Sequence, residues 1–250
     1  MNPNHASNHD RRRFLQVAGA VTATVAFAGL SAAARAARDA TGKVRIGIIG
    51  SGKIGGTLGG LWVKAGHEVM FSSLDLDHDK ALATSLGPNA RAGTPSESAS
   101  FGEVLLMAVP YGALPQLGRD LAGLIKGKVV LDACNPIPGR DGEIGTWARE
   151  KGAGVASAEL LPGARLVRAF NAIGAARLPE IARQQGERTG IPIAGDDADA
   201  IATASSLVRE IGFEPVVIGP MVMGKYLIPG TALAGEHTPE QIRQIAATLK

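Results

Sequence analysis

The sequence has 250 residues, 45% of them hydrophobic, 20% charged and 4% aromatic, which suits one α/β domain with a real core and leaves little chain for a second domain. The net charge of +3 comes partly from arginines in the first forty residues, so the rest of the chain is close to neutral or slightly acidic. With few aromatic residues as well, the composition predicts no nucleic-acid-binding surface.

The first forty residues predict an export signal that lies outside the fold. Three arginines at 11–13 precede Phe14-Leu15-Gln16, and an apolar run from Val17 to Leu30 leads to small residues. This order resembles a twin-arginine signal. The apolar run is shorter than the roughly 20 residues of a membrane span, so an uncleaved anchor is the less favoured alternative. We therefore expect cleavage between Ala34 and Thr41, a periplasmic or extracellular location, and transient contact with the twin-arginine export machinery.

The strongest motif is a glycine-rich turn between a predicted strand and a predicted helix. Residues 44–61 read VRIGIIGSGKIGGTLGGL, in which Gly50, Gly52 and Gly55 form G-x-G-x-x-G. Gly50 allows the sharp bend, Gly52 lets a pyrophosphate approach the backbone, and Gly55 lets the helix pack close to the strand. The phosphates would face N–H groups at the positive end of the helix. A flexible loop is the alternative, but a second predicted strand at 67–71 completes the unit that a dinucleotide-binding motif requires.

Two serines follow this second strand, about 20 residues after the glycine turn. An NAD-specific site would carry an Asp or Glu there for the ribose hydroxyls. Ser72 and Ser73 stand there instead, and serine hydroxyls can donate to a 2′-phosphate that a carboxylate would repel. The residues therefore favour NADP and leave NAD open. The alternative is an ordinary turn into the next helix, with Asp77 or Asp79 as its N-cap.

Strands and helices continue to alternate along the rest of the chain. We expect strands at 90–92, 103–109, 128–131, 166–170, 191–195 and 213–218. Helices are expected at 80–86, from Thr94, at 112–124, from 174 to about 183, at 197–212 and at 240–249. This alternation predicts an α/β fold with a doubly wound, Rossmann-type parallel sheet in a single domain and a short C-terminal extension.

The predicted organisation has three parts: a signal peptide and linker at 1–40, an NAD(P)-binding domain at 41–219, and a C-terminal flap and helix at 220–250. The stretch at 219–229 is apolar and contains methionine. We expect it to cover the site or to meet a second copy of the chain in a homodimer.

Three further segments place polar or backbone groups at the carboxyl ends of predicted strands, where doubly wound sheets bind ligands. The backbone at 108–110 would line the adenosine-ribose side, unless it is a plain turn. The loop at 132–142 holds two prolines and two glycines, and such a rigid loop would fix the amide of Asn135 for a nicotinamide carboxamide or a flavin-type ring. A tight turn capped by Asn135 is the alternative. Asn171 also stands directly after a strand.

Cys134 is the only cysteine, which excludes an intramolecular disulfide and a cysteine-based metal cluster. It follows a predicted buried strand and has no histidine nearby, so we expect a buried, unreactive thiol rather than a nucleophile. No metal site is predicted.

Together these stretches resemble the NADP-dependent oxidoreductases that pass hydride between NADP(H) and the deazaflavin coenzyme F420, and their flavin- or metal-reducing relatives. The matching stretches are IGIIGSGKIGGTL, GHEVMFSS, LLMAVPYGAL, VVLDACNPIPGRDG, LVRAFNAIG and IAGDDADAIATASSLVREIGFEPVVIGP. The resemblance implies that the pyrophosphate is held by Gly50, Ser51, Gly52, Lys53, Ile54 and Gly55. It implies that Ser72 and Ser73 hold the 2′-phosphate, and that the nicotinamide side is surrounded by Val109, Pro110, Asn135, Pro136 and Asn171. Ala108 is expected on the adenosine-ribose side from its position after the strand alone. Relatives usually place an arginine directly after the serine, where this chain has Leu74.

The resemblance implies an NADP(H)- or NAD(H)-dependent enzyme with a flavin or coenzyme F420 as its small-molecule acceptor. Hydride transfer between two bound heterocycles needs positioning in a dry slot, so no catalytic side chain is expected. A hydroxy-acid dehydrogenase would need a general base and a separate helical substrate domain, and only 79 residues (250 − 171) follow Asn171. Two alternatives stay open: an exported dinucleotide-binding protein without turnover, and a flavin-linked metal reductase.

Overall fold

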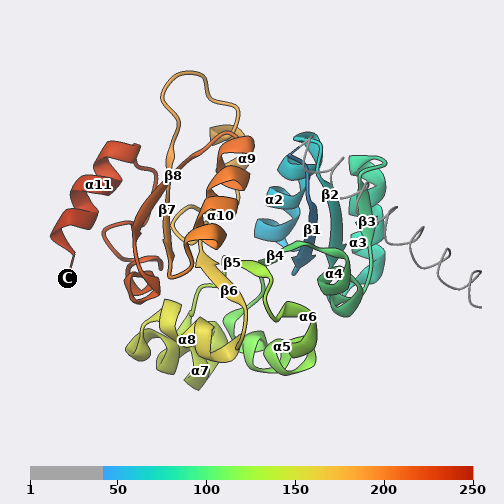
Figure 1. Cartoon of the computed structure of the whole chain (residues 1–250), viewed down its shortest axis with the longest axis horizontal. Helices are drawn as coiled ribbons and strands as arrows, with labels where there is room; N and C mark the ends of the chain where they lie inside the picture. The colour runs from blue at the N-terminus through green and yellow to red at the C-terminus, as the bar shows by residue number, and fades with distance from the viewer. Residues whose placement is uncertain (1–41, 250) are drawn as a thin grey trace, which may run out of the picture. The chain divides into compact units, whose positions relative to one another are not determined.

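The computed structural model describes residues 42–249, and the fold within them is one compact unit that begins at Val44. The predicted export signal lies outside the described residues. An eight-stranded sheet runs through the unit in the order β3-β2-β1-β4-β5-β6-β7-β8 (Figure 1). The strands are β1 Arg45–Ile49, β2 Glu68–Ser72, β3 Ala90–Ala92, β4 Val104–Met107, β5 Val129–Asp132, β6 Arg165–Arg168, β7 Gly190–Gly195 and β8 Glu214–Gly219.

The doubly wound α/β fold is confirmed, with one feature that was not predicted. Strands β1 to β6 are parallel. β7 pairs antiparallel with β6, and β8 is parallel to β7, so the last two strands run against the rest. If β7 were parallel to β6, the chain would need a crossover connection from the carboxyl end of β6 back to the amino end of β7. The segment between β6 and β7 contains only the short helix α9, Leu178–Ile181. The chain order reverses between β1 and β4, which makes this the topological switch point of the sheet.

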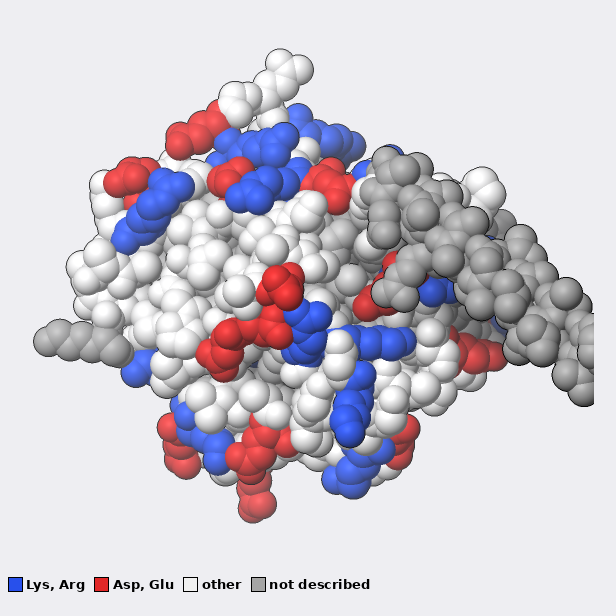
Figure 2. All heavy atoms as spheres, in the orientation of Figure 1, with Lys and Arg blue, Asp and Glu red and all other residues white. Residues whose placement is uncertain are grey.

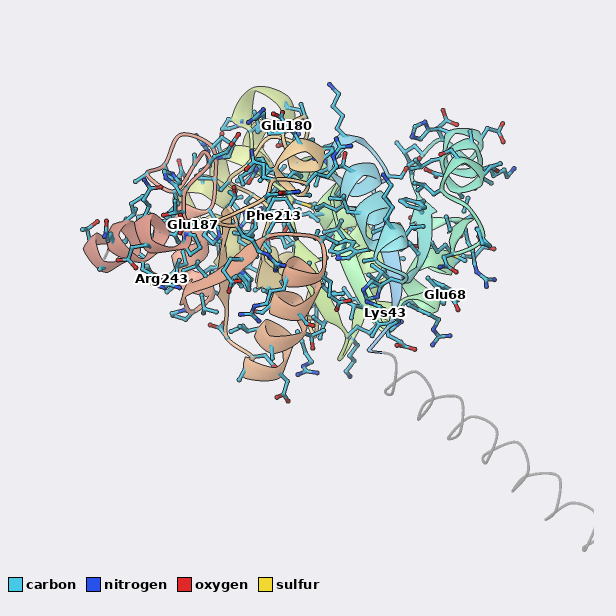
Figure 3. All side chains as sticks on the ribbon, turned by 90° about the horizontal axis from the view of Figure 1, so that it is seen from above. Lys43, Glu68, Glu180, Glu187, Phe213 and Arg243 are labelled. Atoms are coloured by element: carbon cyan, nitrogen blue, oxygen red, sulfur yellow. The ribbon has the colours of Figure 1, made fainter. Side chains whose placement is uncertain are left out.

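Helices cover both faces of the sheet (Figure 1). They are α2 Lys53–Lys64, α3 Leu76–Leu86, α4 Pro95–Phe101, α5 Leu114–Asp120, α6 Ala122–Ile125, α7 Pro138–Lys151, α8 Ala153–Leu160, α10 Ala198–Glu210 and α11 Pro239–Thr248. Because successive strand residues point to opposite faces, β4 gives Leu106 to one core and Leu105 to the other. The rings of Trp62, Phe170 and Phe213 meet edge to face in the first core. Phe213 lies in the interior in Figure 3.

Several predicted elements differ from the structure. The predicted helix at 112–124 is divided into a 3₁₀ helix at Tyr111–Ala113, α5 and α6, because Leu121 has a non-helical backbone. Helix α3 begins at Leu76 rather than near Lys80, because Asp75 is its N-cap and accepts a hydrogen bond from the His78 N–H at 3.0 Å. The predicted loop at 132–142 ends early, because α7 begins at Pro138 and continues through a kink at Gly142, where φ is 60°. The predicted helix at 174–183 shrinks to α9.

The C-terminal part of the chain, residues 220–249, lies within the same compact unit. A 3₁₀ helix at Met221–Tyr226 follows β8 and lies against α8, where a Cβ on Gly154 would be 2.2 Å from the Met221 carbonyl oxygen. Helix α11 starts with a capping box between Thr238 and Gln241. Within residues 42–249, none of the helices combines the length and the apolar character that crossing a bilayer requires. Acidic and basic side chains lie side by side on the face shown in Figure 2.

Candidate dinucleotide-binding site

The glycine turn after β1 has the geometry of a phosphate cradle. Gly50 has φ of 99°, and a Cβ there would be 2.5 Å from the Ala108 carbonyl oxygen. A Cβ on Gly55 would be 2.0 Å from the Gly50 carbonyl oxygen, so only glycine lets α2 pack this close to the strand. Gly52 differs, because a Cβ there would meet no protein atom within 4 Å. The backbone at Gly52 is therefore bare and open, which is the feature that a diphosphate needs.

Helix α2 presents its N-terminal N–H groups at the same place. Gly52 is the N-cap of α2, and no side chain caps this helix. The first N–H groups of a helix have no partner inside it, and they carry the positive end of the helix dipole. The N–H groups of Gly50 and Ser51 are engaged, since both donate to the Ser72 carbonyl oxygen at 2.8 and 3.0 Å. The N–H groups from Gly52 through Ile54 therefore fit a diphosphate best, and the exposed Lys53 side chain stands beside them.

The two serines after β2 are hydrogen-bonded inside the protein. Ser72 is fully buried, and its hydroxyl donates to the Ile48 carbonyl oxygen at 2.7 Å. As placed, it is not free to donate to a 2′-phosphate, so this part of the prediction has no support in the geometry. The hydroxyl of Ser73 lies 2.9 Å from Asp79 Oδ2 and 3.2 Å from the Asp75 carbonyl oxygen.

Asp79 joins the phosphate turn to the end of β2. Its side chain has no exposed surface and lies in the first turn of α3. One carboxylate oxygen accepts a short hydrogen bond from the Ser51 hydroxyl, and the other accepts from Ser73. Sequence reasoning considered Asp79 only as a helix cap. A carboxylate placed between the phosphate turn and β2 is therefore a feature of the site that the sequence did not predict.

The segment after β4 borders the cradle on its other side. The Ala108 N–H donates to the Ile49 carbonyl oxygen at 2.9 Å, which continues the β1–β4 pairing to the edge of the sheet. The Ala108 carbonyl oxygen then faces Gly50, while Pro110 is exposed. The structure thus brings the predicted segment 108–110 to the switch point beside the glycine turn.

Asn135 and Asn171 meet at the carboxyl ends of β5 and β6. The Asn135 side-chain amide donates to the Asn171 carbonyl oxygen at 2.9 Å, and its oxygen accepts from Arg168 at 3.3 Å. The amide is therefore fixed in one orientation, as predicted for this loop, but both its ends are used by the protein. Pro136, predicted beside it, is buried. The side-chain oxygen of Asn171 is buried and accepts no hydrogen bond from the described residues.

Phe170 turns the chain into Asn171 with an unusual backbone. Its φ is 64°, the only positive value at a non-glycine residue in the described part of the chain. This conformation is strained for a bulky side chain and costs about 1–2 kcal/mol. Packing holds it, because the buried ring contacts Trp62 and Phe213 at centroid distances of 6.2 and 6.0 Å.

The thiol of Cys134 is buried, as expected from the sequence, and its Sγ donates to the Met107 carbonyl oxygen at 3.4 Å. Burial raises the pKa of this thiol well above its usual value, which disfavours the thiolate. Burial likewise raises the pKa of Tyr111, whose hydroxyl lies 3.0 Å from that of Ser157. Over residues 42–249, no cluster of three or more His, Cys, Asp and Glu side chains is arranged to hold a metal ion. A cavity of about 310 Å³ between α3 and β3, lined by Lys80, Thr84 and Arg91 among others, is separate from the glycine turn.

Comparison with known proteins agrees with this geometry. Residues 45–136 match the model of the family described as NADP oxidoreductase, coenzyme F420-dependent. The rat (Rattus norvegicus) protein named metalloreductase STEAP3 is 30% identical over 187 residues, which are 72% of this chain. This chain spans only 35% of the length of that relative.

Two solved structures show the same fold. A hypothetical protein from Sinorhizobium meliloti superposes with a TM-score of 0.65 at 24% identity, covering 78% of this chain and 95% of the other. A protein from Arthrobacter sp. FB24, described as a candidate F420-dependent NADP reductase, superposes with a TM-score of 0.60 at 22% identity, covering 73% and 87%. Residues 45–136, then, are similar to the family described as NADP oxidoreductase, coenzyme F420-dependent, and they form the first part of a Rossmann-type fold.

Proposed function

We propose that this chain is an NAD(P)H-dependent oxidoreductase that passes hydride to a flavin or to a deazaflavin such as coenzyme F420. The observation that carries the proposal is the open position at Gly52, in a strand–turn–helix unit that lies inside the matched family segment. A bare backbone beside uncapped N–H groups has little structural purpose, whereas it suits a diphosphate.

Different residues at the carboxyl edge of the sheet would contact different parts of the coenzyme. The backbone from Gly52 to Ile54 would hold the diphosphate, and the segment 108–110 would line the adenosine-ribose side. The unpaired side-chain oxygen of Asn171 would orient the far end, and the Asn135 amide, which donates to the Asn171 carbonyl oxygen, would hold Asn171 in place. The bound nicotinamide would supply the hydride. The chain's own contribution is then close approach and exclusion of water, with no side-chain nucleophile.

A flavin-linked metal reductase is a second candidate, and the similarity to a protein named a metalloreductase favours it. This chain spans 35% of the length of that relative, so the activity in the relative's name comes to this chain only as a proposal. An exported binding protein without turnover is the third candidate. Related sequences usually carry an arginine at the position of Leu74, which is fully exposed here, so this chain lacks one of the residues that the family resemblance implies for the coenzyme.

One experiment separates these candidates. The full chain is titrated with NADH and NADPH by calorimetry, and the reduced coenzyme that binds is then supplied with FMN, FAD, coenzyme F420 and ferric chelates in turn. Turnover with a flavin or F420 supports the proposal, and turnover of ferric chelates only when flavin is added supports the metal reductase. Binding without turnover of any acceptor identifies a binding protein. If neither nucleotide binds, the oxidoreductase proposal is wrong.

Export by the twin-arginine route is a separate proposal, based on Arg11-Arg12-Arg13-Phe14-Leu15. Fusing residues 1–41 to a folded reporter, and replacing all three arginines by lysine, tests it. Export of the lysine variant at the parent level would contradict the proposal.

A further inference from the structure

The residues at the end of β2 decide which coenzyme the site accepts. In Rossmann folds an acidic residue there binds the ribose 2′-hydroxyl of NAD, and an arginine nearby accommodates the 2′-phosphate of NADP. Ser72, Ser73 and Leu74 occupy this place in the chain. Which hydrogen-bond donors and acceptors these residues have left for a ligand depends on the hydrogen bonds that they make within the folded protein.

Neither serine has a hydroxyl proton to give. The Ser72 proton goes to the Ile48 carbonyl oxygen. A hydroxyl has one proton, and both acceptors within reach of Ser73, Asp79 Oδ2 and the Asp75 carbonyl oxygen, belong to the protein. Ser73 also accepts from the Asp75 N–H at 3.1 Å. Its oxygen keeps one lone pair, so it can accept a hydrogen bond from a ribose hydroxyl but cannot donate one to a phosphate oxygen.

The charges around this place are also unfavourable to a phosphate. Asp79 is buried behind Ser73 and Ser51, where the low dielectric strengthens its effect on a nearby ligand. Asp75 and Asp77 are exposed on the same turn, where water and salt screen their charges, and Lys80 is paired with Asp77 at 3.2 Å rather than free for a phosphate. Leu74 is fully exposed and brings no charge.

We propose that the site selects NAD(H) over NADP(H), with Asp79 acting as the specificity-determining residue through Ser73. Asp79 takes the place of the acid that usually ends the second strand, although it comes from the first turn of α3. It holds the Ser73 hydroxyl so that its oxygen faces a ribose diol as an acceptor, and its charge disfavours a 2′-phosphate. This inference rests on the proposed function, because it concerns the same nucleotide site.

The test compares dissociation constants for NADH and NADPH, measured by calorimetry on the full chain and four variants. The parent should bind NADH at least about tenfold more tightly than NADPH. Asp79→Asn should reduce this preference at least about fivefold, since it removes the charge and adds an N–H donor. Leu74→Arg should tighten NADPH binding by a similar factor, by supplying the missing cation.

Two variants serve as matched controls. Asp77→Asn removes an exposed carboxylate from the same helix, and Leu74→Gln adds a polar but uncharged side chain; both should leave the preference within about twofold of the parent. Thermal unfolding checks that each variant is folded. A parent that binds NADPH as tightly as NADH overturns the inference, as does a folded Asp79→Asn variant with an unchanged preference. If Asp79→Asn does not fold, the Leu74→Arg variant decides: the inference is overturned if that variant binds NADPH no more tightly than the parent does. If the parent binds neither NADH nor NADPH, the proposed function itself is overturned.

Discussion

Arg168 and Asp132 form an ion pair in which neither side chain has any exposed surface, with Arg168 Nη1 donating to Asp132 Oδ2 at 2.5 Å. The pair joins the ends of β6 and β5. The same guanidinium donates to the Cys134 carbonyl oxygen at 3.0 Å and to the Leu227 carbonyl oxygen at 2.9 Å. One buried cation thereby ties together two strand ends at the site and the segment that follows the C-terminal 3₁₀ helix.

Arg168→Met should destabilise the protein by about 3–5 kcal/mol, because it leaves the Asp132 carboxylate buried without its counterion. The double variant Arg168→Met, Asp132→Asn should recover part of this loss but not all, since the Cys134 and Leu227 carbonyl oxygens also lose their donor. Urea unfolding of the parent, both single variants and the double variant gives the coupling free energy. A loss below about 1 kcal/mol in the Arg168→Met variant would contradict this account of the pair.

The strand–turn–helix unit around the glycine turn could be predicted from the sequence, because its elements are local. Gly50, Gly52 and Gly55 lie between a continuous apolar strand and an amphipathic helix, and the structure gives each the environment that its position in the motif implies. Parallel strands then bring their carboxyl ends to one edge, so segment 108–110, Asn135 and Asn171 could be placed there from the strand order alone.

The features that the sequence did not predict depend on contacts between distant residues. The sequence indicates only a helix cap at Asp79, because nothing local shows that its carboxylate reaches Ser51, 28 positions earlier. Arg168 interrupts an apolar strand, which was a usable signal, but its partner Asp132 is known only once β5 and β6 are neighbours. The stretch at 132–142 predicts a rigid loop because two prolines and two glycines stand in it, whereas Pro138 is in the first turn of α7, a position that suits proline.

Asp197 should make part of the protein's stability sensitive to acid. Arg165 donates two hydrogen bonds of 2.7 Å to its carboxylate, and the Ala200 N–H donates a third, so together they hold the pKa of Asp197 well below its usual value. A group whose pKa is lowered on folding stabilises the protein above the unfolded pKa of about 3.9, and this contribution is lost as the pH falls through the folded pKa.

Asp197→Asn should therefore lower the melting temperature at pH 5–8 by a nearly constant amount, and the difference from the parent should shrink below about pH 4. Asparagine still caps α10, so the change reports on the charge rather than on the cap. Asp199→Asn is the control, because Asp199 is exposed and lies 3.7 Å from Arg165. A difference between parent and Asp197→Asn that stays constant down to pH 2 would show that the lowered pKa has no effect on stability.

Cys134 should be almost unreactive in the folded protein. Burial raises the pKa of its thiol, and no thiol reagent can reach a buried side chain without an opening of the fold. We expect a disulfide reagent such as DTNB at pH 8 to label the folded chain at least about a hundredfold more slowly than the chain in concentrated urea. Because the sequence has one cysteine, the labelling rate reports on this residue alone. Rapid labelling of the folded chain would mean that the end of β5 opens readily.

Gly52 and Gly55 should separate nucleotide binding from folding. A Cβ at Gly52 meets no protein atom within 4 Å, so Gly52→Val should leave the melting temperature within a few degrees of the parent. The valine side chain fills the space above the helix terminus, so it should weaken NADH and NADPH binding at least about tenfold.

Gly55→Ala brings a methyl group to 2.0 Å from the Gly50 carbonyl oxygen and should instead destabilise the fold by about 1–3 kcal/mol. Gly123→Ala in α6, which also meets no atom within 4 Å, is the control for both and should change neither property. Calorimetric titration and thermal unfolding of the three variants measure the two effects. If Gly52→Val binds both nucleotides as tightly as the parent does, no diphosphate lies against this turn, and the coenzyme site has to be sought elsewhere in the chain.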